Sequence, residues 1–202
     1  MPLHNDYFII ESIQSPDIAD GKIFNDALNA MGYSPKYCKI KNNKEIKKAF
    51  LKFVNSNYRN LFISSHGDEE NLNLINENFN AYDLGDLDID LKKRRIFLST
   101  CNGGNYLLAK YFIKKGAYSV VGTPDKLEQA VAVPLWATMA LLFNRMNDKT
   151  VNFIEIDKAL KKLVRIYKIK LNYFSFIRNN DLEIKQYFYS YKNKRNRTDI
   201  GI

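Results

Sequence analysis

Short apolar runs alternate with segments of helical periodicity along the first half of the chain. Apolar runs bounded by turn residues predict strands at 7–11, 37–41, 61–65, 96–100 and 117–122, with 37–41 at a sheet edge. Between these runs the apolar residues recur every three or four positions, which predicts helices over 15–31, 45–54 and 105–115. Gly32 directly follows the first of these helices and is expected to end it. An apolar segment at 127–146 and an amphipathic one at 151–168 predict two further helices.

Two regions depart from this alternation. The stretch 68–90 is polar and acidic, and we expect a long loop there, with a short strand near 72–75 and a helical turn at 82–87. The segments 171–177 and 182–191 are aromatic and alternate in polarity on either side of a polar turn, which predicts a terminal β-hairpin. The chain as a whole therefore predicts an α/β fold, in which helices cover both faces of a mostly parallel central sheet.

Size and composition agree with one globular domain. A chain of 202 residues, 46% of them hydrophobic, can bury a full core, and no linker or repeat divides it, so we expect a single domain over 1–202. The longest apolar run, 130–143, is too short to span a bilayer, so no membrane partner is expected. Two cysteines are too few for a disulfide framework, and the N-terminus carries no secretory signal. The expected location is the cytoplasm.

The net charge of +9 allows two interpretations. Basic residues are spread over several predicted helices and the tail at 192–197. The first interpretation is a solvated surface whose charge reflects a composition rich in Lys, Asn and Ile. A binding site for a polyanion or an acidic protein is the alternative. No recognisable nucleic-acid-binding motif accompanies the charge, so a nucleic-acid partner stays open but has no motif in its favour.

His66 and Cys101 form the candidate catalytic pair, because each directly follows an apolar predicted strand. The carboxyl ends of parallel strands lie at one edge of a sheet, and neighbouring strands are about 4.8 Å apart. If the two strands are neighbours, an imidazole and a thiol meet there as a base and a nucleophile. Simple packing is the alternative for Cys101, and it is the interpretation adopted for Cys38, which has no histidine nearby. His4 is assigned no role.

The residues that follow Cys101 favour a reactive sulfur. Asn102, Gly103 and Gly104 permit a tight turn with little bulk over the thiol, and a predicted helix follows them. Amides at a helix N-terminus favour negative charge, which a thiolate carries. The backbone amides of Gly67 and Cys101 are the expected oxyanion hole, in which each donor contributes about 3 kcal/mol of transition-state stabilisation.

These motifs resemble those of the caspase-like cysteine peptidases of clan CD, and most closely the bacterial CHAT-type caspase-like domains. The matching pieces are Phe62-Ile-Ser-Ser-His66-Gly67, Ile96-Phe-Leu-Ser-Thr-Cys101-Asn-Gly-Gly104 and Gly116-Ala-Tyr-Ser-Val-Val-Gly122-Thr-Pro124. The resemblance covers residues 7–146, with a weaker match at the terminal hairpin. It implies a caspase-like three-layer sandwich with a C-terminal hairpin.

The resemblance also implies an endopeptidase that works through a thioester, with no metal and no other cofactor. Cys101 takes the place of the nucleophile, His66 that of the general base, and Gly67 that of the oxyanion-hole glycine. Some members carry an aspartate two positions before the cysteine, where this chain has Ser99, so their preference for Arg or Lys is not implied here. The candidate substrate-pocket residues are Asp68, Ser99, Thr123 and Asp125. Ordinary turn residues and a solvated loop are the alternative for most of them.

The predicted function is a small bacterial cysteine endopeptidase that acts on a protein or peptide substrate. An unregulated peptidase would damage the cell, so control by a regulatory protein, a ligand or a cleavage event is expected. One alternative is a catalytically silent caspase-fold binding module, and another is a basic nucleic-acid-binding α/β protein. The placement of His66 and Cys101 carries the prediction, which requires their strands to be neighbours.

Overall fold

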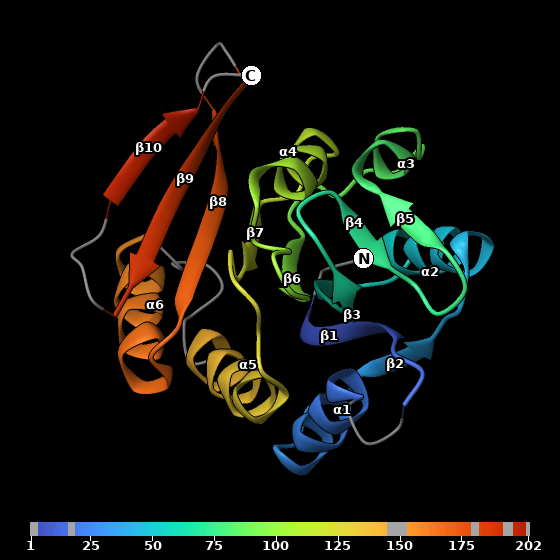
Figure 1. Ribbon diagram of the computed structural model, residues 1–202, viewed down its shortest axis with the longest axis horizontal. Coiled ribbons are helices and arrows are strands. Elements are labelled where there is room, and N and C mark those ends of the chain that lie inside the picture. Colours follow the sequence, from blue (N-terminus) through green and yellow to red (C-terminus); the bar gives the residue numbers. More distant parts are fainter. Residues whose placement is uncertain (1–3, 16–18, 145–152, 179–181, 192–195, 201–202) are drawn as a thin grey trace.

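A parallel sheet forms the centre of the molecule in the computed structural model, which describes residues 4–15, 19–144, 153–178, 182–191 and 196–200. Its parallel strands lie in the order β2-β1-β3-β6-β7 (Figure 1). Their bounds are β1 His4–Ser12, β2 Lys36–Lys39, β3 Tyr58–Gly67, β6 Arg95–Ser99 and β7 Ser119–Gly122. Each strand corresponds to one of the apolar runs, and β2 lies at the edge of the sheet, so these expectations are confirmed.

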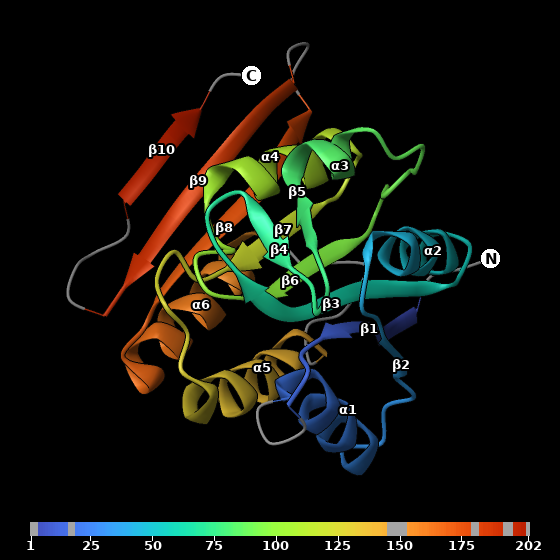
Figure 2. The ribbon, with the colours of Figure 1, turned by 45° about the vertical axis from the view of Figure 1, so that its right-hand side comes forward.

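Three antiparallel strands extend the sheet beyond β7 (Figure 2). β8 (Lys170–Arg178) pairs with both β7 and β9 (Leu182–Ser190), which confirms the predicted hairpin. β10 (Asn196–Ile200) then pairs with β9. The sequence did not predict β10, because its residues show no alternation of apolar and polar positions. The backbone groups along the open edge of β9 provide its partners instead.

Helices cover both faces of this sheet and give the molecule three layers (Figure 1, Figure 2). One face carries α1 (Asp20–Ala30), α5 (Gln129–Asn144) and α6 (Phe153–Tyr167). The other carries α2 (Asn43–Val54), α3 (Ala81–Gly85) and α4 (Tyr106–Lys114). The predicted mostly parallel sheet between two helical layers is therefore confirmed.

The two cores explain why the central strands have continuous apolar runs. In β3, Phe62 packs into the core under α1 and α5, whereas Leu61 and Ile63 pack into the core under α2 and α4. Successive strand residues point to opposite faces, so a strand covered on both sides has no polar positions to alternate with. Trp136 of α5 and Phe112 of α4 are among the largest fully buried side chains of the two cores.

Local signals set the ends of the first two helices. Gly32 adopts a φ of +84°, and the backbone N–H of Tyr33 donates to the carbonyl of Leu28 at 3.0 Å, which closes α1 as expected. The side chain of Asn42 accepts a hydrogen bond from the backbone N–H of Glu45 at 3.0 Å and begins α2. The residues expected to start α1, at 16–18, lie outside the described residues.

The acidic stretch after β3 has more regular structure than the long loop we expected. β4 (Asn71–Asn73) pairs with the end of β3 and with β5 (Asn78–Asn80), so the stretch folds back as a hairpin beside His66. The side chains of Asn80 and Asp83 then cap α3 reciprocally. The short strand expected near 72–75 corresponds to β4, and the helical turn expected at 82–87 corresponds to α3. β5 is only three residues long, which is too short for periodicity to predict it.

The order of the strands places a crevice at the carboxyl edge of the sheet. The chain moves outward from β1 to β2 and then crosses back to β3 on the other side of β1. In open α/β sheets ligands bind outside the carboxyl ends of the strands at such a switch point. Within the described residues, no helix is both long enough and apolar enough to cross a membrane.

Candidate active site

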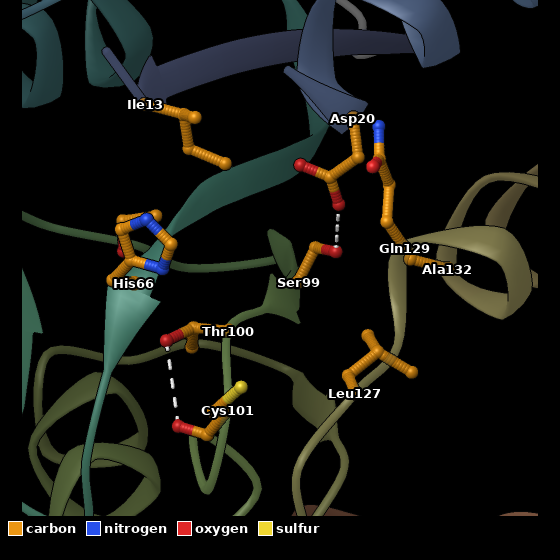
Figure 3. Close-up of a pocket in the computed structure, with 10 residues that line it drawn as sticks. Ile13, Asp20, His66, Ser99, Thr100, Cys101, Leu127, Gln129 and Ala132 are labelled. Carbon is orange, nitrogen blue, oxygen red and sulfur yellow. Dashed lines mark hydrogen bonds between the residues drawn. The ribbon is translucent and has the colours of Figure 1, made fainter. Parts of the chain in front are cut away.

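His66 and Cys101 come from neighbouring parallel strands. In the register of β3 and β6, Ser64 lies opposite Ser99, and two further residues along each strand lead to His66 and Cys101. No strand separates the two, which is the condition that the sequence prediction required. Figure 3 shows the imidazole and the thiol projecting toward the same space at the ends of these strands.

A cavity of about 150 Å³ lies between these two side chains and α5. His66 and Cys101 both line it, and His66 is exposed to solvent. Apolar and polar side chains both contribute to the lining. Its lining consists of Ile13, Asp20, Ser65, His66, Ser99, Thr100, Cys101, Leu127, Gln129 and Ala132 (Figure 3). A side chain with an apolar stem and a polar head therefore matches it in character.

A loop with several hydrogen bonds to other segments holds Cys101. The backbone N–H of Asn102 donates to the carbonyl of Asp125 at 3.1 Å, and that of Gly104 donates to the carbonyl of Thr123 at 2.8 Å. From β8, the side-chain amide of Asn172 donates to the carbonyl of Gly104 at 2.8 Å. The helix after this loop, α4, begins only at Tyr106, so the loop itself and not the first helical turn surrounds the sulfur.

Two glycines at the site have no room for a side chain. A Cβ on Gly104 would lie 2.4 Å from backbone atoms of Gly122, so the nucleophile loop packs directly against the end of β7. A Cβ on Gly67 would lie 2.0 Å from the hydroxyl oxygen of Thr100, the residue before Cys101. Gly67 is thus held close to Thr100, the neighbour of Cys101 in the chain. The role of its amide stays a prediction.

Asp20 is a site residue that the sequence analysis missed. It is the first residue of α1, it is only 5% exposed, and it lines the cavity. Ser64 of β3 and Ser99 of β6 both donate their hydroxyl protons to it. Asp20 follows β1 at the same sheet edge as His66 and Cys101. That position was the one available signal, because no short motif surrounds the residue.

The environment of Asp20 disfavours its negative charge. Burial raises the pKa of the Asp20 carboxyl, and the hydrogen bonds from Ser64 and Ser99 oppose this effect only in part. Ser99 is itself oriented by the indole N–H of Trp136, which donates to its hydroxyl oxygen at 2.8 Å. Glu11, fully buried on β1, also has its pKa raised by burial, and Asp20 adds to the shift by repulsion. An arriving cation would relieve this unfavourable concentration of buried acid.

The remaining predicted pocket residues lie in different places. Ser99 lines the cavity, as described above. Thr123 and Asp125 lie on the loop behind it and line a second cavity. Asp68 lines neither cavity, and its carboxylate accepts hydrogen bonds from the backbone N–H groups of Glu70 and Asn71 at 2.9 and 2.8 Å. Of these four, only Ser99 contributes to the cavity that His66 and Cys101 share.

Two further features concern possible metal ligands and the second cysteine, Cys38. In the part of the chain that the structure describes, no three His, Cys, Asp or Glu side chains come together as metal ligands. Cys38 is partly buried on β2 and packs against the core under α2, in agreement with its assignment to packing. The side chain of His4 lies outside the described residues.

Comparison with known proteins identifies the fold. No protein-family model and no curated protein sequence matches this chain. Solved structures do match it, among them two of a bacterial proteinase. A complex of the pro- and mature domains of Porphyromonas gingivalis RgpB aligns with a TM-score of 0.55 and 12% identity, over 97% of this chain and 68% of that chain. The Arg-specific cysteine proteinase gingipain R (RGPB) aligns with a TM-score of 0.57 and 12% identity, over 97% of this chain and 66% of that chain.

This chain has the fold of gingipain R. The match confirms the caspase-like architecture expected from the sequence. The chain spans about two thirds of the length of the gingipain structures that it matches. At 12% identity the likeness concerns the fold, and the chemistry has to be argued from the residues of this chain.

Proposed function

We propose that this protein is a cysteine endopeptidase in which Cys101 is the nucleophile and His66 the general base. The observation that supports it best is the shared cavity at the ends of β3 and β6, which both side chains line. A pairing of this kind, on a loop with almost no side-chain bulk around the sulfur, suits attack on a peptide carbonyl. The fold shared with a cysteine proteinase adds to the same case.

The reaction would take two steps. The sulfur of Cys101 attacks the carbonyl carbon, its proton passes to His66, and His66 gives that proton to the leaving amine as the peptide bond breaks. Water then attacks the resulting thioester, with His66 as base, and releases the new carboxylic acid and the thiol. The backbone amides of Gly67 and Cys101 would stabilise the oxyanion in each step.

The cavity further favours a basic residue on the acyl side of the cut bond. Ile13, Leu127 and Ala132 provide apolar walls for the stem of an Arg or Lys side chain, and Asp20 offers a carboxylate to its cationic head. Ser64 and Ser99 hold that carboxylate in place and leave it facing the cavity. Gingipain R is described as Arg-specific, and we propose the same class of substrate here, with Asp20 rather than a residue near the cysteine as the recognition group.

Regulation, family subtype and location are part of the same proposal. We infer a bacterial, cytoplasmic, CHAT-like peptidase whose activity depends on a regulatory partner or ligand. The RgpB structure is a complex of pro- and mature domains, so peptidases of this fold can be held by a second protein segment.

Active-site labelling and a fluorogenic peptide series test the proposal together. A thiol-directed acyloxymethyl ketone with Arg next to the reactive group is expected to label the wild type and Cys38→Ser, and to lose labelling in Cys101→Ala. His66→Ala is expected to retain the fold, as judged by circular dichroism, and to lose turnover of Arg peptides. Labelling that persists in Cys101→Ala would refute the assignment of the nucleophile. A folded protein that neither reacts nor turns over, alone or with cell lysate, would favour the silent binding module.

A further inference from the structure

A second, larger cavity lies on the other side of the loop that connects β7 to α5. Its volume is about 430 Å³, which is in the range of small-ligand sites. The loop 123–128, the turn between α6 and β8, and Tyr191 at the end of β9 surround it. None of the catalytic steps above uses this cavity.

The cavity is rich in cationic side chains. Lys126, Lys168 and Lys170 line it, together with the carboxylates of Asp125 and Glu128, so its formal charge is positive. The ammonium group of Lys170 forms an ion pair with Asp125 at 2.9 Å, and both side chains are about half exposed. Lys168 adopts a φ of +52°, a left-handed conformation that is uncommon outside glycine. That conformation turns the chain sharply between α6 and β8 and brings Lys168 and Lys170 to the same cavity.

The wall of this cavity is also the support of the nucleophile loop. The carbonyl oxygen of Asp125 accepts a hydrogen bond from the backbone N–H of Asn102, and the carbonyl oxygen of Thr123 accepts one from the backbone N–H of Gly104. The side chain of Asp125 forms the ion pair with Lys170. Leu127, two residues further along, lines both cavities. A change in the position of loop 123–128 would therefore reach both the Cys101 loop and the wall of the first cavity.

We propose that this second cavity binds an anionic group through Lys168 and Lys170, and that its occupancy alters the position of the Cys101 loop. A carboxylate or phosphate that enters the cavity competes with Asp125 for the ammonium group of Lys170. Releasing Asp125 loosens the segment whose carbonyls hold Asn102 and Gly104. The anion comes either from an acidic side chain of the substrate or from a small free ligand. The binding stands on the cavity alone, whereas the effect on Cys101 rests on the proposed function.

Calorimetric titration with inorganic pyrophosphate, on the full chain at low ionic strength, tests the binding. We expect dissociation in the micromolar to millimolar range that weakens at least about tenfold in Lys168→Gln/Lys170→Gln, since a charge-assisted hydrogen bond contributes about 1.5–3 kcal/mol. Lys158→Gln/Lys162→Gln is the matched control: it removes two positive charges from exposed positions of α6 outside the cavity. Equal weakening in the control, or no binding by the wild type, would overturn the site.

Two further measurements separate the source of the anion from its effect. One measurement uses Arg peptides that carry Glu or Ala at each of the three positions before the Arg. The site is assigned to the substrate if one Glu peptide has a lower KM than its Ala counterpart, and if this difference disappears in the double variant and in the presence of pyrophosphate. Pyrophosphate binding without any such preference assigns it to a free ligand. The alkylation rate of Cys101 by iodoacetamide, in a Cys38→Ser background, is expected to change at least twofold when pyrophosphate binds. An unchanged rate would overturn the coupling, whatever the turnover of the enzyme.

Discussion

Replacing Asp20 by Asn is the sharpest perturbation of the proposed substrate pocket. The change keeps the size of the side chain and removes the carboxylate that, among the described residues, lines the cavity beside His66 and Cys101. An asparagine can still accept a hydrogen bond from Ser64 or Ser99, so the local packing should persist. The variant therefore tests recognition of a cation and leaves the reacting groups in place.

The burial of Asp20 sets the expected magnitude. The residue is 5% exposed, so an ion pair that it forms with a guanidinium is largely removed from water. Breaking one partner of a buried pair costs about 3–5 kcal/mol, and each 1.36 kcal/mol is a factor of ten, so kcat/KM for an Arg peptide should fall about 150- to 5000-fold. A citrulline peptide has the same shape without the charge. Its kcat/KM should change less than about tenfold, because a neutral hydrogen bond contributes about 1 kcal/mol.

The assay compares peptides that differ only in Arg, Lys or citrulline before the cut bond. Glu11→Gln serves as the matched control, since it also removes a buried carboxylate next to the site but one that does not line the cavity. The ratio of Arg to citrulline turnover is the quantity measured, so a general loss of activity cancels. An unchanged ratio in Asp20→Asn, or an equal fall in Glu11→Gln, would contradict the assignment of Asp20.

Three further predictions concern pH dependence and stability. Because burial raises the pKa of Asp20, kcat/KM for Arg peptides should fall as the pH drops through that raised value, while the citrulline peptide lacks this limb of the pH profile. Glu11 binds its proton more tightly in the folded protein than in the unfolded chain, so its contribution to stability is full at low pH and is lost as the pH rises. The free energy of unfolding of Glu11→Gln, measured in urea, should therefore exceed that of the wild type at about pH 8, and the difference should disappear at about pH 4. Gly104→Ala should cost about 1–3 kcal/mol of unfolding free energy, because its Cβ meets the Gly122 backbone, whereas Gly32→Ala, with open space but a φ of +84°, should cost less.

The sequence predicts the parallel strands well because two-sided burial leaves a distinct pattern. Leu61 and Ile63 pack into one core and Phe62 packs into the other, so no polar residue interrupts the run. The short hairpin β4–β5 and the strand β10 form mainly because β3 and β9 offer backbone partners, and such pairing leaves no periodic signal. A strand that forms mainly through its neighbour is predicted only once the neighbour is placed.

The proposed catalytic pair and the proposed recognition carboxylate of Asp20 also differ in how well the sequence predicts them. His66 and Cys101 each directly follow an apolar run, and the expectation that the two runs become neighbours was enough to join them. Asp20 reaches the cavity only because α1 folds back over the edge of the sheet and meets Ser64 and Ser99. Position 99 carries no carboxylate of its own. In the fold, Ser99 instead holds a carboxylate that comes from 79 positions away in the chain.

The anchoring of the nucleophile loop has a consequence for the ribosome-bound chain. Cys101 and His66 are both synthesised well before Thr123, Asp125 and Asn172, whose amide and carbonyl groups hold the loop. A nascent polypeptide that has emerged only as far as α4 carries the thiol and the imidazole but not the segments that hold the turn after Cys101. The turn after Cys101 is thus held in place only after β8 has left the exit tunnel, so translation itself delays the moment at which the two side chains reach their final arrangement.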